Sequence, residues 1–504
     1  MEKNSTIKKL KRNIISGFFS QLLLMAMGII VPRLVLVSFG SEVNGFLNSI
    51  SQIFTCMEVL EAGVGTATLQ ALFQYTGNGN KDKMNAVLSA TTIFYNRIGR
   101  IYLLLLVGIA VIYPIFVTSS IGFGTMFLVI LMQGIPGAIS YFVQAKFRIL
   151  LSADGRTYVQ NNVLLITRIL SNIAKILLIL RGYNVLSVQF AFFLIQMGQV
   201  LVYKLYEQKK YHWVNYHEQP DFNAIAQKKN VFIHQISGLI FSNTDLLVLT
   251  AFCDLKVVSV YSVYSMILSM VSNIINTVAS SIYFVLGQVF NQDRKRYIIL
   301  HDLYETYYMG FVFAMYTVTY ILIIPFLKIY TRGVTDISYL DKNLPALFVL
   351  IHFLQVGRAA SLNVLNFSQM FKETMHHAII EMLLNIIVSL VGAYYYGIYG
   401  VLAGTIVALL YRGNVMIYYA NKKVLHRSCW ITYRRWFVCF CIFILSTIVA
   451  SVKSFSVSGY FSFFLHAIPI SITVCITYFV VLSMVERDVF RYLEQWVLVR
   501  RTTK

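Results

Sequence analysis

Positively charged side chains inside hydrophobic segments are the residues of this chain best suited to chemistry. Arg33 directly follows Pro32 in the run LLLMAMGIIVPRLVLVSF, and later apolar runs contain Arg168, Lys175 and Arg358. A cation so far inside a hydrophobic run costs roughly 2.5–3.5 kcal/mol on insertion scales, so it is expected to face the protein interior or a water-filled cavity. These four cations are therefore predicted to line a cavity within the membrane.

Four carboxylates lie in or beside segments of the same kind: Glu58, Glu61, Asp245 and Glu381. Two roles are open to them, because a carboxylate in a membrane protein either neutralises a nearby cation or carries a proton or another coupling ion. A salt bridge from Arg33 to one of the first three is the structural alternative to a cavity role for that arginine. The residues alone do not rank these roles.

Polar residues recur at helical spacing and form stripes on otherwise apolar segments. Steps of three or four residues keep such positions within about 60° on one helical face. Polar stripes must be buried away from lipid, so converging stripes predict a hydrophilic cavity; the alternative is that they join neighbouring helices. The second segment carries Asn44, Asn48, Ser51, Thr55 and Glu58, and the fifth carries Asn161, Arg168, Asn172 and Lys175.

Composition assigns the chain to the membrane proteins. Of its 504 residues, 58% are hydrophobic and only 12% are charged, and the mean hydropathy is +0.68. Apolar runs of about 20 residues, long enough to cross a hydrocarbon core of about 30 Å, recur along the whole chain. The predicted fold class is an all-α polytopic membrane protein with about fourteen transmembrane helices. The predicted spans lie at about 14–37, 43–73, 86–117, 123–151, 158–180, 185–206, 231–252, 257–288, 299–330, 342–368, 375–396, 398–420, 436–452 and 461–484.

The distribution of Lys and Arg predicts the topology. The formal net charge is +21, with 42 Lys and Arg against 21 Asp and Glu. When both termini are placed in the cytoplasm, most of these cations fall in cytoplasmic connections, as the positive-inside rule requires. The basic balance thus needs no nucleic acid partner, and the cationic face suits anionic headgroups of membrane lipids. The predicted outer connections contain only Arg181, Lys256, Lys328, Arg332, Lys342 and Lys453.

An internal repeat with an offset near 213 residues divides the chain. At this offset Arg168 falls opposite Glu381, and Arg33 falls opposite Asp245 at an offset of 212. Each repeat holds six spans, an even number, so both enter the membrane from the same side and form two lobes around a central cavity. The predicted parts are an N-terminal lobe at 1–206, a cytoplasmic connection at 207–229, a C-terminal lobe at 230–423, and two accessory helices with a cytoplasmic tail at 424–504.

Motifs that would indicate an enzyme or a cofactor are missing from the sequence. There is no GxxxxGK[ST] phosphate loop, which argues against nucleotide hydrolysis as an energy source. The predicted outer connections are short, whereas a membrane glycosyltransferase or polymerase is expected to present carboxylates on a sizeable extramembrane platform. The six cysteines show no paired spacing, and the histidines have no metal-ligand context. We therefore predict a protein that is not an enzyme and that has no metal and no cofactor.

Four stretches of the chain resemble the Wzx-type polysaccharide flippases, a family of the multidrug/oligosaccharidyl-lipid/polysaccharide exporter superfamily. They are residues 11–54, 61–73 (EAGVGTATLQALF), 146–163 (KFRILLSADGRTYVQNNV) and 243–267, and the resemblance extends over essentially the whole chain as diffuse patterns. It implies twelve core helices in two lobes plus two accessory helices. It also implies a cationic central cavity, which Arg33, Arg168, Lys175 and Arg358 are placed to supply.

The resemblance further implies a bacterial cytoplasmic membrane protein that moves undecaprenyl-pyrophosphate-linked oligosaccharide repeat units to the outer leaflet by alternating access, for capsular or other surface polysaccharide. Polysaccharide polymerase machinery is a further partner that the resemblance suggests. Two alternatives share the architecture: exporters of other lipid-linked cell-wall precursors, and cation-coupled multidrug antiporters, whose cavities typically centre on acids. The mixed charges here, with Arg33 and Asp245 at related positions, weaken the antiporter alternative without removing it.

Overall fold

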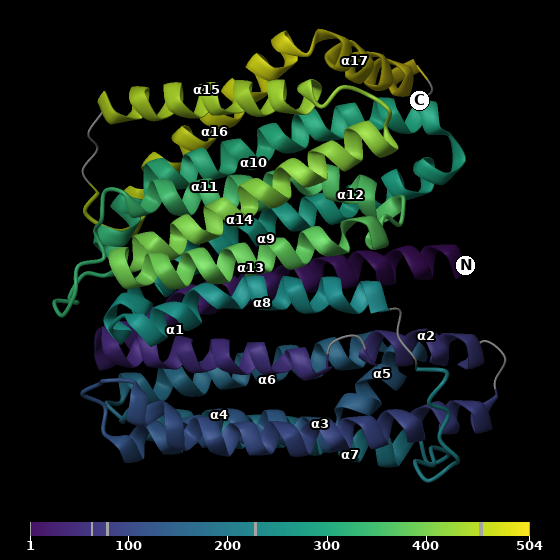
Figure 1. The fold of residues 1–504 in the computed structure, drawn as a ribbon, viewed down its shortest axis with the longest axis vertical. Helices are drawn as coiled ribbons and strands as arrows, with labels where there is room; N and C mark the ends of the chain where they lie inside the picture. The colour runs from purple at the N-terminus through teal and green to yellow at the C-terminus, as the bar shows by residue number, and fades with distance from the viewer. Residues whose placement is uncertain (1, 62–63, 77–79, 226–228, 453–456, 503–504) are drawn as a thin grey trace. The chain divides into compact units, whose positions relative to one another are not determined.

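The computed structural model describes residues 2–61, 64–76, 80–225, 229–452 and 457–502, and within these ranges it is built of helices (Figure 1). Thirteen helical stretches of the described chain are long and apolar enough to cross a membrane, which agrees with the predicted all-α polytopic class. The first elements are α1 (Glu2–Met57), η1 (Glu58–Glu61), α2 (Val64–Thr76), α3 (Lys81–Phe116), α4 (Phe123–Val143), α5 (Ala145–Ala153), α6 (Thr157–Leu180) and α7 (Val185–Lys210). The others are α8 (Lys229–Phe252), α9 (Leu255–Gln292), α10 (Arg294–Tyr330), α11 (Leu344–Gly357), α12 (Ala359–Phe367), α13 (Phe371–Tyr396), α14 (Ile398–Tyr418), η2 (Tyr419–Val424), α15 (Trp430–Val452), α16 (Tyr460–Val485) and α17 (Arg487–Thr502).

The helix α1 consists of two helices in sequence, because its backbone breaks at Gly40. Gly40 has φ 85° and ψ 173°, a conformation that residues with a Cβ rarely adopt. The first two predicted spans meet at this break, and the thirteen stretches count them once, as Ala26–Glu61. The predicted span 43–73 is not one continuous helix: the α-helix ends at Met57, a 3₁₀ turn follows, and α2 begins at Val64.

Two other predicted spans are also interrupted, one in each half of the chain. α4 gives way to α5 at Gln144, within the predicted span 123–151. α11 gives way to α12 at Arg358, within the predicted span 342–368. Both residues keep backbone angles of the right-handed helical region, with φ −102° and ψ −24° at Gln144 and φ −73° and ψ −5° at Arg358. Each break is therefore a local interruption of the helix rather than a stretch of irregular backbone.

The chain separates into two compact units, each with its own helices and core. The predicted lobe boundaries at 206 and 230 stay predictions, since the units are defined by internal contacts rather than by function. Unit 1 comprises Met1–Leu239 and Asp254–Ser259, and unit 2 comprises Ile240–Cys253 and Val260–Lys504.

Corresponding helices of the two units begin in corresponding ways. The Asn80 side chain caps α3 by accepting from the backbone N–H of Lys83 at 3.1 Å. The Asp293 side chain, 213 residues further along, caps α10 by accepting from the backbone N–H of Arg296 at 3.0 Å. Such caps satisfy N–H groups that a helix leaves unpaired at its start. The offset equals the one found in the sequence, so the repeat extends to the helix ends.

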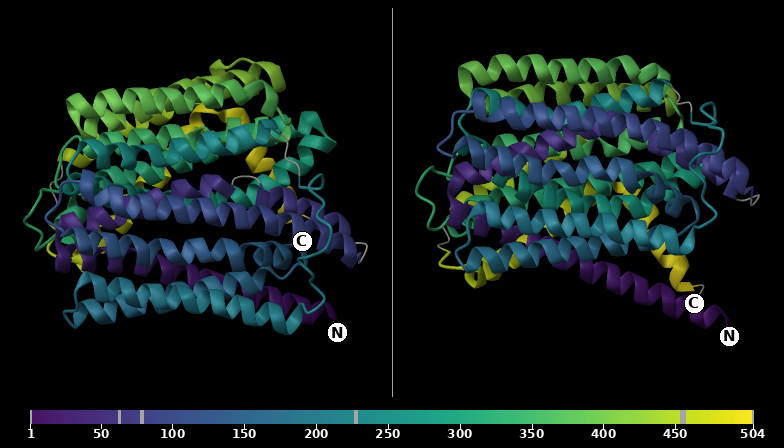
Figure 2. Two further views of the ribbon diagram at one scale, coloured as in Figure 1. Left: turned by 60° about the horizontal axis from the view of Figure 1, so that its bottom comes forward. Right: turned by 90° about the horizontal axis from the view of Figure 1, so that it is seen from below.

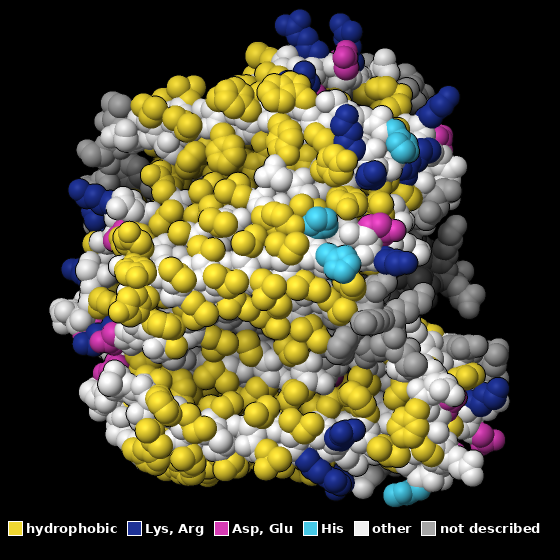
Figure 3. All heavy atoms as spheres, in the orientation of Figure 1, with side chains coloured by type: hydrophobic (Ala, Val, Ile, Leu, Met, Phe, Trp, Pro, Cys, Tyr) yellow, Lys and Arg dark blue, Asp and Glu magenta, His cyan; other side chains and the backbone are white. Residues whose placement is uncertain are grey.

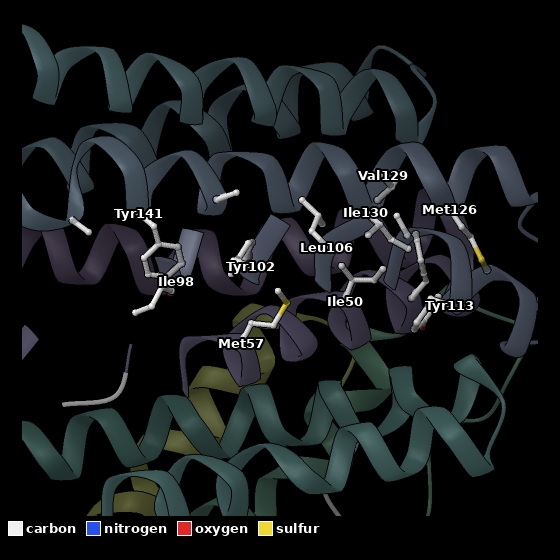
Figure 4. Close-up of a cluster of buried hydrophobic side chains, with 14 of the residues drawn as sticks. Ile50, Met57, Ile98, Tyr102, Leu106, Tyr113, Met126, Val129, Ile130 and Tyr141 are labelled. Atoms are coloured by element: carbon white, nitrogen blue, oxygen red, sulfur yellow. The ribbon is translucent and has the colours of Figure 1, made fainter. Parts of the chain in front are cut away.

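A hydrophobic cluster in unit 1 holds α3 and α4 side by side, with residues of α1 against them (Figures 1, 2 and 4). Gly134 permits this close packing, because a Cβ there would lie 2.2 Å from Leu106 Cδ1. Tyr102 and Tyr141 pack within the cluster with ring centroids 5.5 Å apart. Both tyrosines also line a cavity, so the core positions the cavity wall.

In unit 2, α13 and α14 approach backbone to backbone. A Cβ on Gly400 would lie 2.0 Å from the carbonyl oxygen of Gly392. Small residues allow such contact in membrane proteins, where packing rather than the hydrophobic effect associates helices. The approach brings two polar side chains together, and Asn385 Nδ2 on α13 donates to Thr405 Oγ1 on α14 at 2.9 Å.

The outer surface of the helices suits a lipid environment. Hydrophobic side chains cover the middle of the helices on the face seen in Figure 3, and charged side chains concentrate near the helix ends. Leu104 on α3 is 75% exposed and Phe461 on α16 is 85% exposed. Contiguous exposure of large apolar residues is uncommon in soluble proteins, whereas lipid tails are as apolar as these side chains.

Candidate functional site

A cavity of about 810 Å³ lies within unit 1. Its walls come from α1, η1 and the helices α2 to α7, so helices far apart in the sequence enclose it. Four of its charged residues belong to the predicted set, and one, Arg148, does not. The charged residues of the lining are Glu58, Glu61, Arg148, Arg168 and Lys175.

The two acids are aligned by the 3₁₀ turn η1. Side chains three residues apart lie above one another in a 3₁₀ helix, so Glu58 and Glu61 project to the same side. Glu61 Oε1 accepts from the Tyr95 hydroxyl at 2.5 Å, which ties this acid to α3. Glu58 is exposed and forms no hydrogen bond with a residue of the described chain. The acids therefore lie at the cavity without neutralising a cation by direct contact.

Two predicted cations, Arg168 and Lys175, lie seven residues apart on α6. Seven residues are about two helical turns, so both side chains reach the same face of the helix. Lys175 Nζ lies 4.4 Å from the ring centroid of Phe192 on α7, a cation–π contact. Neither cation forms a hydrogen bond or an ion pair with a residue that the structure describes. The cavity thus contains two positive charges for which the described side chains supply no direct counter-charge.

Arg148 is a further cavity cation, which sequence analysis did not single out. It lies on α5, beyond the break at Gln144. With the Gln160 amide oriented to suit its neighbours, its oxygen accepts from Arg148 Nε and Nη2 at 3.1 Å each. The prediction of one straight span over 123–151 put Arg148 at a cytoplasmic helix end, where cations are ordinary. The available signal was the cluster of turn-forming residues that follows, Asp154 and Gly155, but it does not reveal the break.

The predicted polar stripes divide between the two interpretations left open for them. Ser51 and Glu58 line the cavity. Asn44 instead is buried and its Nδ2 donates to Ser259 Oγ at 2.6 Å, so it joins helices within unit 1. On α6, Arg168 and Lys175 line the cavity, whereas Asn161 is exposed and is not part of the lining. Helical spacing therefore predicted the polar face but not the task of each residue on it.

Arg33 lies on α1 and is half-buried. It is not among the residues that line the cavity of unit 1. Its role as a cavity cation stays a prediction.

Arg358 in unit 2 is paired with an acid. It occupies the break between α11 and α12, and its Nη1 donates to Glu381 Oε1 on α13 at 2.7 Å. The other carboxylate oxygen of Glu381 lies 3.4 Å from Arg412 Nε on α14. Arg412 is 4% exposed and its Nη1 also donates to the carbonyl oxygen of Thr374 at 3.1 Å. One carboxylate thus balances two arginines, which favours the charge-balancing role for Glu381 over the coupling role.

Asp245 on α8 is surrounded by neutral donors. Thr405 Oγ1 donates to its carboxylate at 2.7 Å, Asn385 Nδ2 at 3.3 Å and the Tyr261 hydroxyl at 3.1 Å. The residue is 7% exposed. A buried carboxylate without a cationic partner is costly unless it is protonated or binds a cation. These surroundings are those expected of a coupling acid.

A second charge cluster in unit 2 attaches the accessory helix α15 to α10. Glu305 of α10 is 1% exposed and accepts from Arg427 Nη2 at 3.1 Å, from Thr432 Oγ1 at 2.9 Å and from Arg435 Nη1. His301, Asp302 and Glu305 have ligand atoms within 4.8 Å of one another, which is close enough for a metal ion. Arg427 and Arg435 already pair with both carboxylates, so little negative charge is left for a metal.

No family model and no curated protein matches the chain. Solved structures match it at low identity. A lipid II flippase MurJ in an inward closed conformation has a TM-score of 0.66 at 15% identity, over 94% of this chain and 100% of that one. A multidrug resistance MATE family transporter of the MOP superfamily, inward-facing, has a TM-score of 0.56 at 12% identity, over 79% of this chain and 94% of that one. A MOP superfamily transporter from Pyrococcus furiosus has a TM-score of 0.51 at 14% identity, over 81% and 95% of the two chains.

The chain therefore has the fold of the MOP superfamily transporters, the multidrug/oligosaccharidyl-lipid/polysaccharide exporters. The likeness is one of fold, and the solved proteins that share this fold are named as a flippase and as transporters. The predicted superfamily fold is confirmed. The Wzx-type family within the superfamily and the substrate stay predictions.

Proposed function

We propose that this protein is a flippase that moves undecaprenyl-pyrophosphate-linked oligosaccharide repeat units from the cytoplasmic to the outer leaflet of the bacterial cytoplasmic membrane, for surface polysaccharide biosynthesis. The observation that carries the proposal is the pair Arg168 and Lys175 in the cavity of unit 1, which lacks direct counter-charge among the described residues. A pyrophosphate entering a low-dielectric site unpaired would meet a prohibitive desolvation cost. Cations already held there offset that cost, and an arginine fork can hold phosphate oxygens in pairs.

Movement follows from the repeat. The lobes at 1–206 and 230–423 rock against each other and open a cleft first to the cytoplasm and then to the outside, while the polyprenyl tail stays in lipid. Both termini remain cytoplasmic. Outward movement of an anionic headgroup across an inside-negative membrane is favoured by about 2.3 kcal/mol per charge per 100 mV, so the membrane potential biases the direction. Polymerase machinery outside would then consume the delivered units.

A second candidate is a cation-coupled antiporter, which one observation favours. Asp245 is a buried carboxylate whose described partners are Thr405, Asn385 and Tyr261, all neutral. Such a group can take up a proton or a metal cation during transport. Asp245 is also compatible with a flippase that is driven by ion exchange. The charge of the transported substrate therefore distinguishes the two candidates, since the flippase moves an anionic lipid headgroup and the antiporter moves a cationic drug. An exporter of a related lipid-linked cell-wall precursor would use the same cations, and the solved structure with a TM-score of 0.66 is named a lipid II flippase.

The test measures lipid movement in liposomes that contain the purified protein. The probe is undecaprenyl pyrophosphate carrying a fluorescent N-acetylhexosamine, and an impermeant quencher reports the fraction in the outer leaflet. Arg168→Gln and Lys175→Gln are each expected to slow movement by about 10-fold or more, the effect of losing one charged hydrogen bond. The matched control is Arg181→Gln, which removes an exposed cation at the end of the same helix.

The outcomes separate the candidates. Movement of the probe that falls in both cavity variants but not in Arg181→Gln supports the flippase. If the probe moves as fast in Arg168→Gln and Lys175→Gln as in the wild-type protein, the cavity of unit 1 is not the binding site for the pyrophosphate. If the wild-type protein moves cationic dyes under an ion gradient but leaves the pyrophosphate probe in place, the antiporter is correct and the flippase proposal is wrong.

A further inference from the structure

One wall of the cavity in unit 1 is built from neutral amide side chains. Gln133 lies on α4, Gln144 follows that helix directly, and Gln196 and Gln199 lie on α7. Their spacing explains the shared face: Gln133 and Gln144 are eleven residues apart, about three turns, and Gln196 and Gln199 are three apart. The cations Arg168 and Lys175 lie on α6. A fifth amide of the lining, Gln160, also lies on α6 but pairs with Arg148, so the amides of this wall lie at α4 and α7 rather than on the helix of the two cations.

The amides retain unused hydrogen-bonding capacity. Gln144 is 5% exposed, and its Nε2 donates to Ser140 Oγ at 2.7 Å, whereas its buried Oε1 has no partner among the described residues. Gln199 is 8% exposed, and neither it nor Gln196 forms a side-chain hydrogen bond with any residue the structure describes. Polar groups taken out of water without a partner cost free energy. Such groups facing a cavity are suited to a ligand that supplies the missing partners.

The chemistry of this wall fits a neutral, hydroxyl-rich ligand. Each amide offers two N–H donors and an oxygen acceptor, and each sugar hydroxyl offers one O–H donor and an oxygen acceptor, so an amide can donate to one hydroxyl and accept from another. An anion would be held better by the cations, and a cationic drug by acids. The cavity volume of about 810 Å³ lies within the range of about 300–1,000 Å³ that is usual for small-molecule sites.

We propose that the amide wall formed by Gln144, Gln196 and Gln199 binds the sugar portion of the transported lipid, while Arg168 and Lys175 hold its pyrophosphate. This assignment rests on the proposed flippase function and adds a sugar subsite to it. The two parts of one headgroup are then recognised by two walls of one cavity. The amides select lipids that carry a saccharide over the bare lipid carrier, which shares the pyrophosphate.

The test compares binding of two kinds of probe to the full-length protein in lipid nanodiscs. One probe is undecaprenyl pyrophosphate, and the others carry glucose, galactose or N-acetylglucosamine on the same lipid. The wild-type protein is expected to bind at least one saccharide-bearing lipid about 10-fold more tightly than the bare lipid. The double variant Gln196→Leu/Gln199→Leu should lose this preference and still bind the bare lipid within about 2-fold of wild type. The control Gln208→Leu changes an exposed glutamine of α7 outside the cavity and should keep the preference.

Retained binding of the bare lipid shows that the double variant is folded. If the wild-type protein binds the bare lipid but prefers none of the saccharide-bearing lipids, the subsite is wrong and the flippase proposal stands. A double variant that weakens both probes equally also overturns the subsite. If the wild-type protein binds none of the pyrophosphate lipids, the proposed function itself fails.

Discussion

Replacement of Glu381 by glutamine tests whether this acid exists to balance charge. In unit 2 its carboxylate oxygens lie 2.7 Å from Arg358 Nη1 and 3.4 Å from Arg412 Nε. The side chains of Arg358, Glu381 and Arg412 are 13%, 10% and 4% exposed. Glu381→Gln therefore leaves two nearly buried guanidinium groups with no carboxylate between them.

The expected magnitude follows from this geometry. Removing one partner of a buried ion pair costs roughly 3–5 kcal/mol, and slight solvent access at Arg358 and Glu381 puts this case at about 3 kcal/mol. Arg358→Gln instead leaves Arg412 and Glu381 as a balanced pair, so the loss is about 1 kcal/mol, one hydrogen bond. At about 2–4 °C per kcal/mol for a unit of this size, the melting temperature should fall by about 6–12 °C for Glu381→Gln and about 2–4 °C for Arg358→Gln.

Thermal unfolding of the purified protein in detergent measures these differences. Glu373→Gln is the matched control, because Glu373 is an exposed acid on the same helix. The double variant Glu381→Gln/Arg412→Gln should recover part of the loss, since the two residues interact directly. Equal melting temperatures for Glu381→Gln and Arg358→Gln would refute the reasoning. A stable Glu381→Gln protein whose transport no longer responds to an ion gradient would assign the coupling role to Glu381.

Two other predictions concern two further acids of unit 2, Asp245 and Glu305. Asp245→Asn keeps an acceptor for the Thr405 hydroxyl but removes the negative charge. It should therefore abolish the dependence of transport on a sodium or proton gradient in liposomes. A gradient dependence equal to that of the wild-type protein would contradict the coupling role of Asp245. Glu305→Gln leaves Arg427 and Arg435 paired with Asp302 and Glu486, so it should weaken the attachment of α15 to α10 by about 2 kcal/mol, less than the loss of a sole partner. Maleimide labelling of the buried thiol of Cys439 on α15 should then accelerate by about 30-fold. Unchanged labelling of that thiol would show that the charge cluster does not hold α15.

The spanning helices were predictable because a hydrophobic run of sufficient length has few alternatives in a membrane protein. The breaks within those helices were not predictable from hydropathy. Gln144 and Arg358 lie between apolar stretches, and hydropathy averages over both sides of them. Whether a helix continues or turns at such a point depends on tertiary packing. For the same reason the turn at Glu58–Glu61, which aligns two cavity acids, was absent from the prediction.

Charged residues in apolar runs stand out in a sequence, but their partners do not. Arg168 and Arg358 are equally conspicuous, and both were predicted to be cavity cations. In the structure Arg168 lines a cavity, whereas Arg358 contacts Glu381. The two arginines differ because the fold brings a carboxylate within about 3 Å of Arg358 and none within that distance of Arg168 among the described residues. The sequence repeat does not indicate this partner, because its offset aligns Glu381 with Arg168 rather than with Arg358. The amide wall of Gln144, Gln196 and Gln199 was not predicted from the sequence, because a glutamine on a membrane helix joins helices as readily as it faces a water-filled cavity.

The two repeats place opposite charges at related positions, and the surroundings of these charges explain why. At the offset of 213 residues, Arg168 of unit 1 corresponds to Glu381 of unit 2. Arg168 faces a cavity without an acid bonded to it in the described chain, whereas Glu381 neutralises two arginines. Asp245 in unit 2 contacts only neutral donors among its described partners. In the proposed function, the positive charge of unit 1 would serve the anionic headgroup, and the carboxylate of Asp245 in unit 2 would serve a coupling ion. Under that proposal the repeats have to differ at these positions, because the residue that corresponds to the cavity cation Arg168 is the acid Glu381, which is already occupied by two arginines.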